Sequence, residues 1–328
     1  LPGIASLKSA AYWRSLSRTS GPGMGLARLE MLREERPELF CSGCLAAGAG
    51  EILFHRLTGV WRQDAGNALQ FGCYNVPEAR LDGEPLELVG VTADFVSPLR
   101  RGHETAPLAV KAARRTGFPP GIPVAGPYFD HEAGYLAAEG VCDRPLQVSL
   151  GTAWVGNLRL EPGESCRSWL PLIVPAVSGS GSLVVQPLRT GNLVWEWALA
   201  TFAGSSGARG LARARRVFAE RLLPPPGLVM LPELGRPNPL SLRGAGSGAF
   251  HGIGLAGGRG DLLRATVAGM CFELARVFAA VRESRKADGV VLGGGAAKGP
   301  WFRELLASLF FPLPVSRVVE GDAAGAYG

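Results

Sequence analysis

Residues 290–310 read VVLGGGAAKGPWFRELLASLF, and this stretch decides the fold class. The apolar run Val290–Leu292 predicts a short buried strand, the glycine-rich segment 293–299 predicts a turn, and Trp301–Phe310 predicts a helix. A strand that runs through a glycine turn into a helix is the repeating step of an α/β sheet with crossover helices.

The residues on either side extend this pattern. From Asp261 to Val281, apolar residues recur in steps of three and four, which predicts one long helix with Asp261 at its N-cap. After the quoted stretch, Pro314–Val319 predicts the beginning of another strand. The last eighty residues therefore indicate an α/β domain.

Further upstream, Leu146, Val148 and Leu150 alternate with polar residues, Gly151–Thr152 predicts a turn, and the chain continues at Trp154. This is the pattern of a strand, a turn and a second strand. Since 328 residues exceed one comfortable core, we expect two domains, 1–143 and 144–328, with the boundary just before this unit.

In the first domain, residues 24–40 predict a helix limited by Pro37, and 67–96 are expected to be irregular. A short helix is expected within Pro107–Thr116. Ile122–Ala125 predicts a buried strand that leads through a loop to Asp130, and a helix rich in small residues follows.

Composition excludes several classes of protein. Apolar residues make up 47% and charged residues 19%, which argues against disorder, and no apolar run is long enough for a transmembrane helix. The net charge is +6, but the arginines are scattered with no interleaved aromatic residues, so we expect neither a nucleic-acid nor a membrane partner.

Six cysteines are present, of which Cys41 and Cys44 form a single C-x-x-C. No second pair stands at zinc-ribbon spacing, and the pair does not lie at a strand-to-helix redox turn. Reduced cysteines in a cytoplasmic protein are the expectation.

Two glycine turns are candidate phosphate sites. The 293–299 loop opens a helix, where backbone N–H groups favour an anion, but its spacing matches neither a dinucleotide-binding fingerprint nor a Walker A loop. A Rossmann dehydrogenase is thereby disfavoured. At Gly151–Thr152 the backbone can approach a phosphate and the hydroxyl can donate to it. A structural turn remains the alternative for both.

Asp130 is the candidate catalytic carboxylate. It is expected just beyond the C-terminal end of a buried strand, where open α/β sheets place reactive groups, and it could accept a proton from a substrate hydroxyl. Helix capping is the alternative. His131 and Glu132 follow directly, but adjacent residues diverge on a helix, so a metal site is disfavoured.

Taken in order, these segments resemble the FGGY family of carbohydrate kinases. The matching motifs are Leu57-Thr58-Gly59 with Asp64 and Asn67-Ala68, the strand and loop Gly121–Asp130, Ser149-Leu150-Gly151-Thr152, the signature-like stretch 248–267 and the G-G-G-A loop beginning at Gly293. The motifs are specific as an ordered set that covers nearly the whole chain.

The resemblance implies a two-domain actin-like ATPase fold of ribonuclease-H-like α/β domains. It also implies phosphorylation of a sugar, ketose or polyol by ATP with Mg²⁺, with a homodimer as a possible assembly. Asp130 would be the general base and His131 a substrate contact. The implied nucleotide-binding residues are Gly151 and Thr152 at the terminal phosphates and Gly191, Gly294, Gly295 and Ala296 around the adenosine.

The sequence also departs from the family pattern. No opening strand with a D-x-G-T-like turn precedes Leu1, and the closing helix is cut at Gly328, so we expect a truncated kinase with an incomplete first domain and little activity of its own. Ala153, Ala268 and Lys298 replace the usual residues. A catalytically degenerate nucleotide- or sugar-binding protein on the same scaffold is the alternative.

Overall fold

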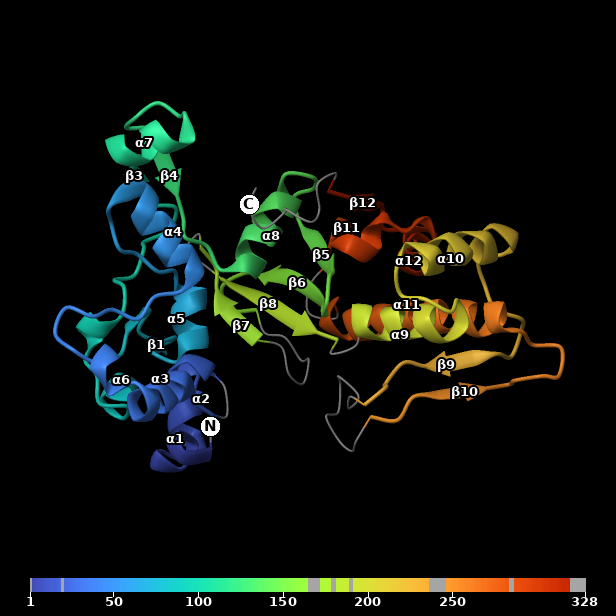
Figure 1. The fold of residues 1–328 in the computed structure, drawn as a ribbon, viewed down its shortest axis with the longest axis horizontal. Helices are drawn as coiled ribbons and strands as arrows, with labels where there is room; N and C mark the ends of the chain where they lie inside the picture. The colour runs from blue at the N-terminus through green and yellow to red at the C-terminus, as the bar shows by residue number, and fades with distance from the viewer. Residues whose placement is uncertain are drawn as a thin grey trace. The chain divides into compact units, whose positions relative to one another are not determined.

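The computed structural model describes the chain in seven segments, coloured in Figure 1: residues 2–18, 21–164, 172–177, 181–188, 191–235, 246–282 and 286–318. The chain divides into two compact units. The first unit comprises Leu1–Glu132 with Ile173–Leu183, and the second comprises Ala133–Leu172 with Val184–Gly328. The expected domain boundary between residues 143 and 144 stays a prediction.

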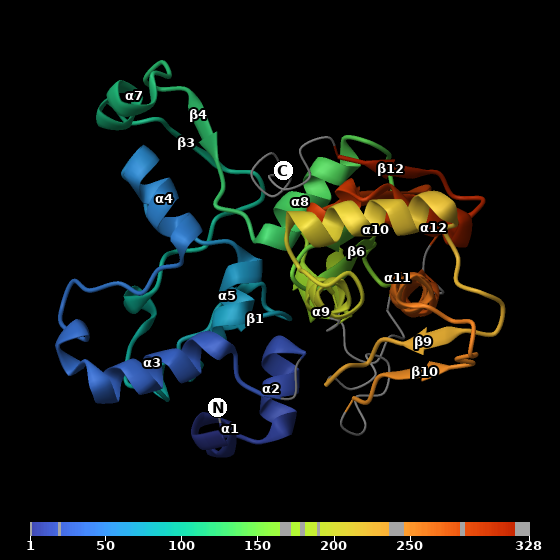
Figure 2. The same cartoon turned by 45° about the vertical axis from the view of Figure 1, so that its right-hand side comes forward.

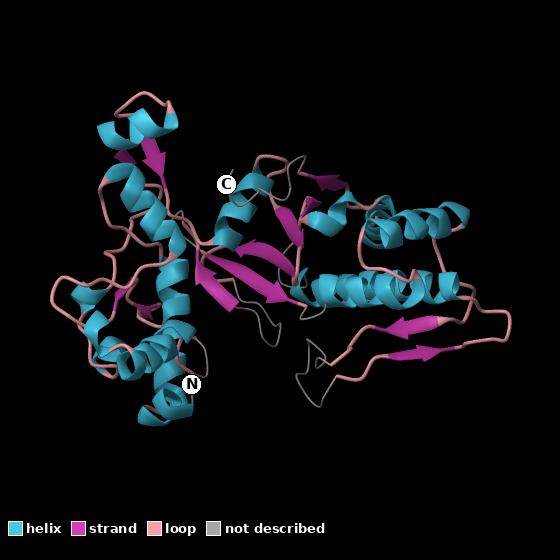
Figure 3. Ribbon diagram, in the orientation of Figure 1, coloured by secondary structure: helices cyan, strands magenta, loops and turns pink. Residues whose placement is uncertain are grey.

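A six-stranded mixed sheet, whose strands are magenta in Figure 3, has the order β12-β11-β5-β6-β8-β7. β5 runs parallel to β11, with Ser149 opposite Gly293, and antiparallel to β6, with Leu150 opposite Trp154. The strands are β5 (Pro145–Leu150), β6 (Trp154–Leu160), β7 (Leu172–Pro175), β8 (Ser182–Pro187), β11 (Gly289–Gly293) and β12 (Val315–Arg317). The predicted strand–turn–strand unit and the α/β sheet are confirmed. Val319, the end of the strand expected at 314–319, lies outside the described residues.

Helices α9, α10 and α12 of the second unit pack against α11 (Figure 2), which also contacts strand β9. In β6, an added Cβ on Gly156 would lie 2.0 Å from the ring of Phe278, so α11 packs directly against the sheet. The elements are α8 (Asp130–Glu139, which begins in the first unit), α9 (Asn192–Phe202), α10 (Ala208–Glu220), β9 (Val229–Leu231), β10 (Ala249–His251), α11 (Arg259–Arg282), the 3-10 helix η3 (Gly295–Lys298) and α12 (Pro300–Phe310).

The expected long helix is present as α11, but Asp261 is not its N-cap. The helix begins two residues earlier, and the Asp261 carboxylate accepts the backbone N–H of Gly258 at 3.1 Å. It also pairs with Arg264 at 3.0 Å, one turn along the helix. Asp261 therefore lies inside the first turn of the helix and accepts a backbone N–H that precedes the helix.

The first unit is mainly helical. Its elements are α1 (Pro2–Leu7), α2 (Ala10–Ser17), α3 (Met24–Glu35), η1 (Pro37–Leu39), α4 (Ala49–Thr58), α5 (Ala65–Phe71), β1 (Tyr74–Asn75), β2 (Arg80–Leu81), α6 (Glu84–Glu87), η2 (Ala93–Phe95), β3 (Thr105–Pro107), α7 (Val110–Thr116) and β4 (Pro123–Ala125). None of the helices in the described part of the chain is both long and apolar enough to cross a bilayer.

The strand expected at 122–125 is present as β4, but the prediction of a buried strand is wrong. β4 pairs antiparallel with β3 in a separate two-stranded sheet, and its first and last residues are exposed. Pro123 lacks an N–H for the ladder, and a three-residue strand presents only Val124 to one side. Asp130 therefore does not follow a strand of the main sheet.

Candidate active site

Asp64 joins two parts of the first unit that are 65 residues apart. Its carboxylate caps α5 by accepting the backbone N–H of Asn67 at 2.7 Å, and it also accepts the backbone N–H of Phe129. The side chain is buried, and this burial raises the pKa of Asp64 even though both N–H donors and Arg100 favour the charged form. Asp64 thus ties the loop at 126–129 to the start of α5.

Arg100 holds the same loop from another side. Its guanidinium lies 3.9 Å from the Asp64 carboxylate, and both side chains are almost completely buried. Its Nε donates to the carbonyl oxygen of Pro127 at 3.2 Å, and the guanidinium lies 4.3 Å from the centroid of the Tyr128 ring. Arg100 therefore contacts Pro127 and Tyr128 of the loop. It also lies beside the Asp64 carboxylate, which binds the N–H of the next loop residue.

Close backbone approach completes the attachment. A Cβ added to Gly66 in α5 would lie 2.8 Å from the Cβ of Phe129, and one added to Gly50 in α4 would lie 3.4 Å from Pro127. Only glycine lets α5 come this near to Phe129. The loop that leads to Asp130 is therefore fixed by α4, α5 and Arg100 together.

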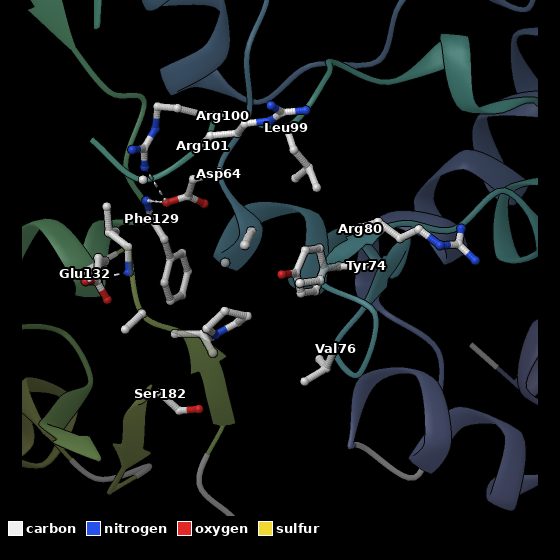
Figure 4. Close-up of a pocket in the computed structure, with 18 of the residues that line it drawn as sticks. Asp64, Tyr74, Val76, Arg80, Leu99, Arg100, Arg101, Phe129, Glu132 and Ser182 are labelled. Atoms are coloured by element: carbon white, nitrogen blue, oxygen red, sulfur yellow. Dashed lines mark hydrogen bonds and ion pairs between the residues drawn. The ribbon is translucent and has the colours of Figure 1, made fainter. Parts of the chain in front are cut away.

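A pocket of about 620 Å³ lies in the first unit beside this loop (Figure 4). Asp64, Arg100, Phe129 and Glu132 line it together with residues of the 174–182 segment. The buried Glu132 accepts the backbone N–H of Val177 at 3.3 Å, which joins α8 to that segment. A mostly preformed hollow of this size with a few convergent polar groups suits a small polar ligand.

The structure places Asp130 and His131 next to this pocket but not among its lining residues. Phe129 and Glu132, three positions apart, share the face that lines it. Asp130 is exposed at the start of α8, and its Oδ1 accepts the N–H of His131 at 2.9 Å. Burial lowers the pKa of His131 although the charge of Asp130 raises it, so the imidazole is neutral near pH 7.

In the second unit, the predicted glycine turns converge on one point. Gly294 has φ +85°, and a Cβ there would lie 2.6 Å from the carbonyl carbon of Leu150 and 2.9 Å from the nitrogen of Gly151. A Cβ on Gly191 would lie 2.7 Å from the carbonyl oxygen of Thr152. The structure thus brings the turns at 151–152, 191 and 294 together.

This cluster has the features of an anion site. It lies where the parallel strands β5 and β11 both end, and the N-terminus of α9 follows Gly191. Thr152 is exposed, and a Cβ on Gly295 would meet no atom within 4 Å, so there is room beside the backbone. Ala296 is buried under the same loop. These residues fit a polyphosphate nucleotide.

A bound metal ion would need side chains that can ligate it. Among the described residues, no cluster of three or more His, Cys, Asp or Glu side chains could hold one. Mg²⁺ is commonly held by one or two carboxylates together with substrate phosphates, so a site for it would not require such a cluster.

Comparison with known proteins identifies the type of domain. Residues 9–137 match the model for the N-terminal domain of the FGGY family of carbohydrate kinases. The predicted resemblance to this family is therefore confirmed.

One curated relative, a gluconokinase from Bacillus licheniformis, is 23% identical over 308 residues, which are 88% of this chain and 58% of the relative. The chain thus spans less than two thirds of its length.

Solved structures agree on the fold. A xylulose kinase from Rhodospirillum rubrum superposes with a TM-score of 0.79 at 21% identity, covering 99% of this chain and 67% of that one. The glycerol kinase of Plasmodium falciparum, solved with ADP, gives 0.77 at 12% identity, covering 99% and 66%. The predicted actin-like ATPase fold is confirmed.

Asp64 and Arg100 had only partial signals in the sequence. Asp64 stood three residues before Asn67, a spacing typical of a helix cap, and also in a family-like motif. Arg100 looked like one of many scattered arginines. Nothing in the local sequence indicated that it would be buried against Asp64.

The buried Glu51 in α4 leads to a prediction about pH. Burial and the nearby charge of Asp64 raise the pKa of Glu51, while the N–H of Gly48, donated at 2.9 Å, opposes the shift. The folded state therefore binds this proton more tightly than the unfolded state. The contribution of Glu51 to the free energy of unfolding falls as pH rises from about 4 through the folded pKa.

We expect Glu51→Gln, which keeps an acceptor for Gly48, to raise the free energy of unfolding more at pH 7 than at pH 4. Urea unfolding at both pH values measures the difference. Glu34→Gln, at an exposed position on α3, is the matched control for loss of one negative charge. An equal effect of Glu51→Gln at both pH values would show that the buried carboxyl does not titrate differently on folding.

Proposed function

Because residues 9–137 match the model for the N-terminal domain of the FGGY family of carbohydrate kinases, we propose that the protein containing residues 1–328 is a carbohydrate kinase. It transfers the γ-phosphoryl group of ATP to a hydroxyl of a sugar, ketose or polyol. The observation that carries the proposal is the loop fixed by Asp64 and Arg100, which ends at Asp130 beside a pocket of about 620 Å³. The relatives named above act on related polyhydroxylated compounds, as their names state.

In this proposal Asp130 is the general base. Its carboxylate is exposed, so it can reach a substrate hydroxyl, and it accepts the proton as the oxygen attacks phosphorus. Phosphoryl transfer depends mostly on positioning and charge stabilisation, which is why a fixed loop before the base matters. The imidazole of His131, next in the chain, is the proposed contact for a substrate hydroxyl.

The glycine cluster of the second unit is the proposed ATP site. Backbone N–H groups of the 151–152 turn and the Thr152 hydroxyl bind the terminal phosphates, while Gly191, Gly294, Gly295 and Ala296 lie along the adenosine. The close approach of Gly294 to Leu150 and Gly151 supports this, since it keeps side chains out of the turn. When bound, Mg²⁺ would neutralise charge on the phosphate oxygens.

In the full-length protein that contains residues 1–328, we expect Asp130→Asn to lower kcat by about 10²–10⁴ because the hydroxyl loses its proton acceptor. The assay is sugar-dependent ADP release with xylulose, gluconate and glycerol, with ATP affinity measured by calorimetry and expected to be unchanged. Asp143→Asn, an exposed carboxylate beyond α8, is the control. Near-normal turnover of Asp130→Asn would remove Asp130 from the mechanism. If the unsubstituted protein binds ATP but releases no ADP with any substrate, a non-catalytic binding protein is the better description.

A pair of glycine variants tests the nucleotide site. Gly294→Ala should weaken ATP binding at least about tenfold, ~1.4 kcal/mol, because its Cβ would collide with the 150–151 backbone at positive φ. Gly295→Ala, one residue on, meets open space and should leave the backbone of the turn unchanged. Thermal unfolding of both variants checks that each is folded. An ATP affinity of Gly294→Ala equal to that of the unsubstituted protein would place the nucleotide elsewhere.

A further inference from the structure

Cys41 and Cys44 lie in a tight turn of the first unit, directly after η1. The N–H of Cys44 donates to the carbonyl oxygen of Cys41 at 3.1 Å, and Gly43 has φ +84°, the value that a type II turn requires at its third residue. The two Sγ atoms are 2.7 Å apart. A disulfide bond is ~2.05 Å long, so bond formation needs only a small approach of the two sulfurs.

The thiols of this pair are accessible to solvent. Cys41 is exposed and Cys44 is partly exposed. Cys73 and Cys271 are buried, and burial raises the pKa of Cys73 to about 12 and that of Cys271 also. Cys142 is partly exposed, and burial raises its pKa as well, whereas Cys166 lies outside the described residues. Among the described thiols, Cys41 is therefore the most accessible to an external reagent, and Cys44 lies beside it.

The two sulfurs lie within hydrogen-bond distance, and either of them can be the donor. The hydrogen bond to Cys44 is the main cause that raises the pKa of Cys41. Either sulfur can therefore attack an external disulfide, and the other then resolves the mixed disulfide.

We propose that Cys41 and Cys44 form a reversible intramolecular disulfide by exchange with a low-molecular-weight disulfide such as glutathione disulfide. The thiolate of one cysteine attacks one sulfur of that disulfide, giving a mixed disulfide and one glutathione thiolate. The other cysteine then gives up its proton and attacks the protein sulfur of the mixed disulfide, releasing the second glutathione. The protein pair is oxidised by two electrons, the reagent is reduced to two thiols, and the protons of the two cysteines pass to the released thiolates.

The surrounding contacts give the disulfide a structural consequence. Phe40 stacks on Phe95, with ring centroids 5.3 Å apart, and the N–H of Ala46 donates to the carbonyl oxygen of Phe95 at 2.8 Å. The turn is thus attached on both sides to η2, and the chain from η2 continues to Arg100. Closing the disulfide would stiffen the support of a segment that lines the pocket.

A metal site is the competing use of a C-x-x-C. Among the described residues, no third His, Cys, Asp or Glu joins the pair in a group that could hold a metal ion. Two thiols alone fall short of the four ligands of a structural zinc site. The observations therefore favour redox exchange over metal binding.

The test is incubation of the purified chain with glutathione disulfide, followed by intact-mass and peptide analysis without reductant. We expect the loss of two hydrogens, a bridge between Cys41 and Cys44, no retained glutathione, and full reversal by dithiothreitol. Cys41→Ser should instead trap glutathione on Cys44. Cys142→Ser, away from the turn, should still form the bridge, and circular dichroism checks that both variants fold.

Three results would overturn the proposal. Stable glutathione adducts on the unsubstituted protein would show that the second thiol does not resolve the first. A bridge that involves Cys142 or Cys166 would place the reactive pair elsewhere. Zinc that co-purifies with the chain and is lost in Cys41→Ser would assign the pair to a metal.

Discussion

The buried ion pair between Asp64 and Arg100 is the constraint on which the proposed chemistry of the first unit depends. Burying two charges is costly, and the cost is offset only when every partner is well placed. Here the partners are the N–H groups of Asn67 and Phe129 and the carbonyl oxygen of Pro127. Since two of the three belong to the loop before Asp130, these contacts attach the loop to Asp64 and Arg100.

In the second unit, a different interaction holds the proposed binding residues together. Its glycine cluster is organised by close backbone approach. Gly191 and Gly294 contact the 151–152 turn at distances that a side chain would prevent. The backbone groups of three separate turns are thereby presented together, as a bound polyphosphate would require.

Long periodic segments were predictable from the sequence, and tertiary partners were not. The helix at α11, the strand–turn–strand of β5 and β6 and the glycine turn after β11 follow from local pattern, because period and turn chemistry are local properties. The prediction that residues 122–125 form a buried strand was wrong, since a short apolar run does not reveal which sheet it joins. The helix α5 lay partly in a segment expected to be irregular. Arg100 was missed because its partner is distant in sequence.

The central claim is that Arg100 and Asp64 hold the loop that ends at Asp130. Hydrogen exchange of the Phe129 amide, followed by NMR relative to the core amide of Val148, tests it directly. In Arg100→Met the Phe129 amide should exchange at least about tenfold faster, ~1.4 kcal/mol, while the exposed Arg101→Met should leave it unchanged. Unaltered protection of Phe129 in Arg100→Met would contradict the account.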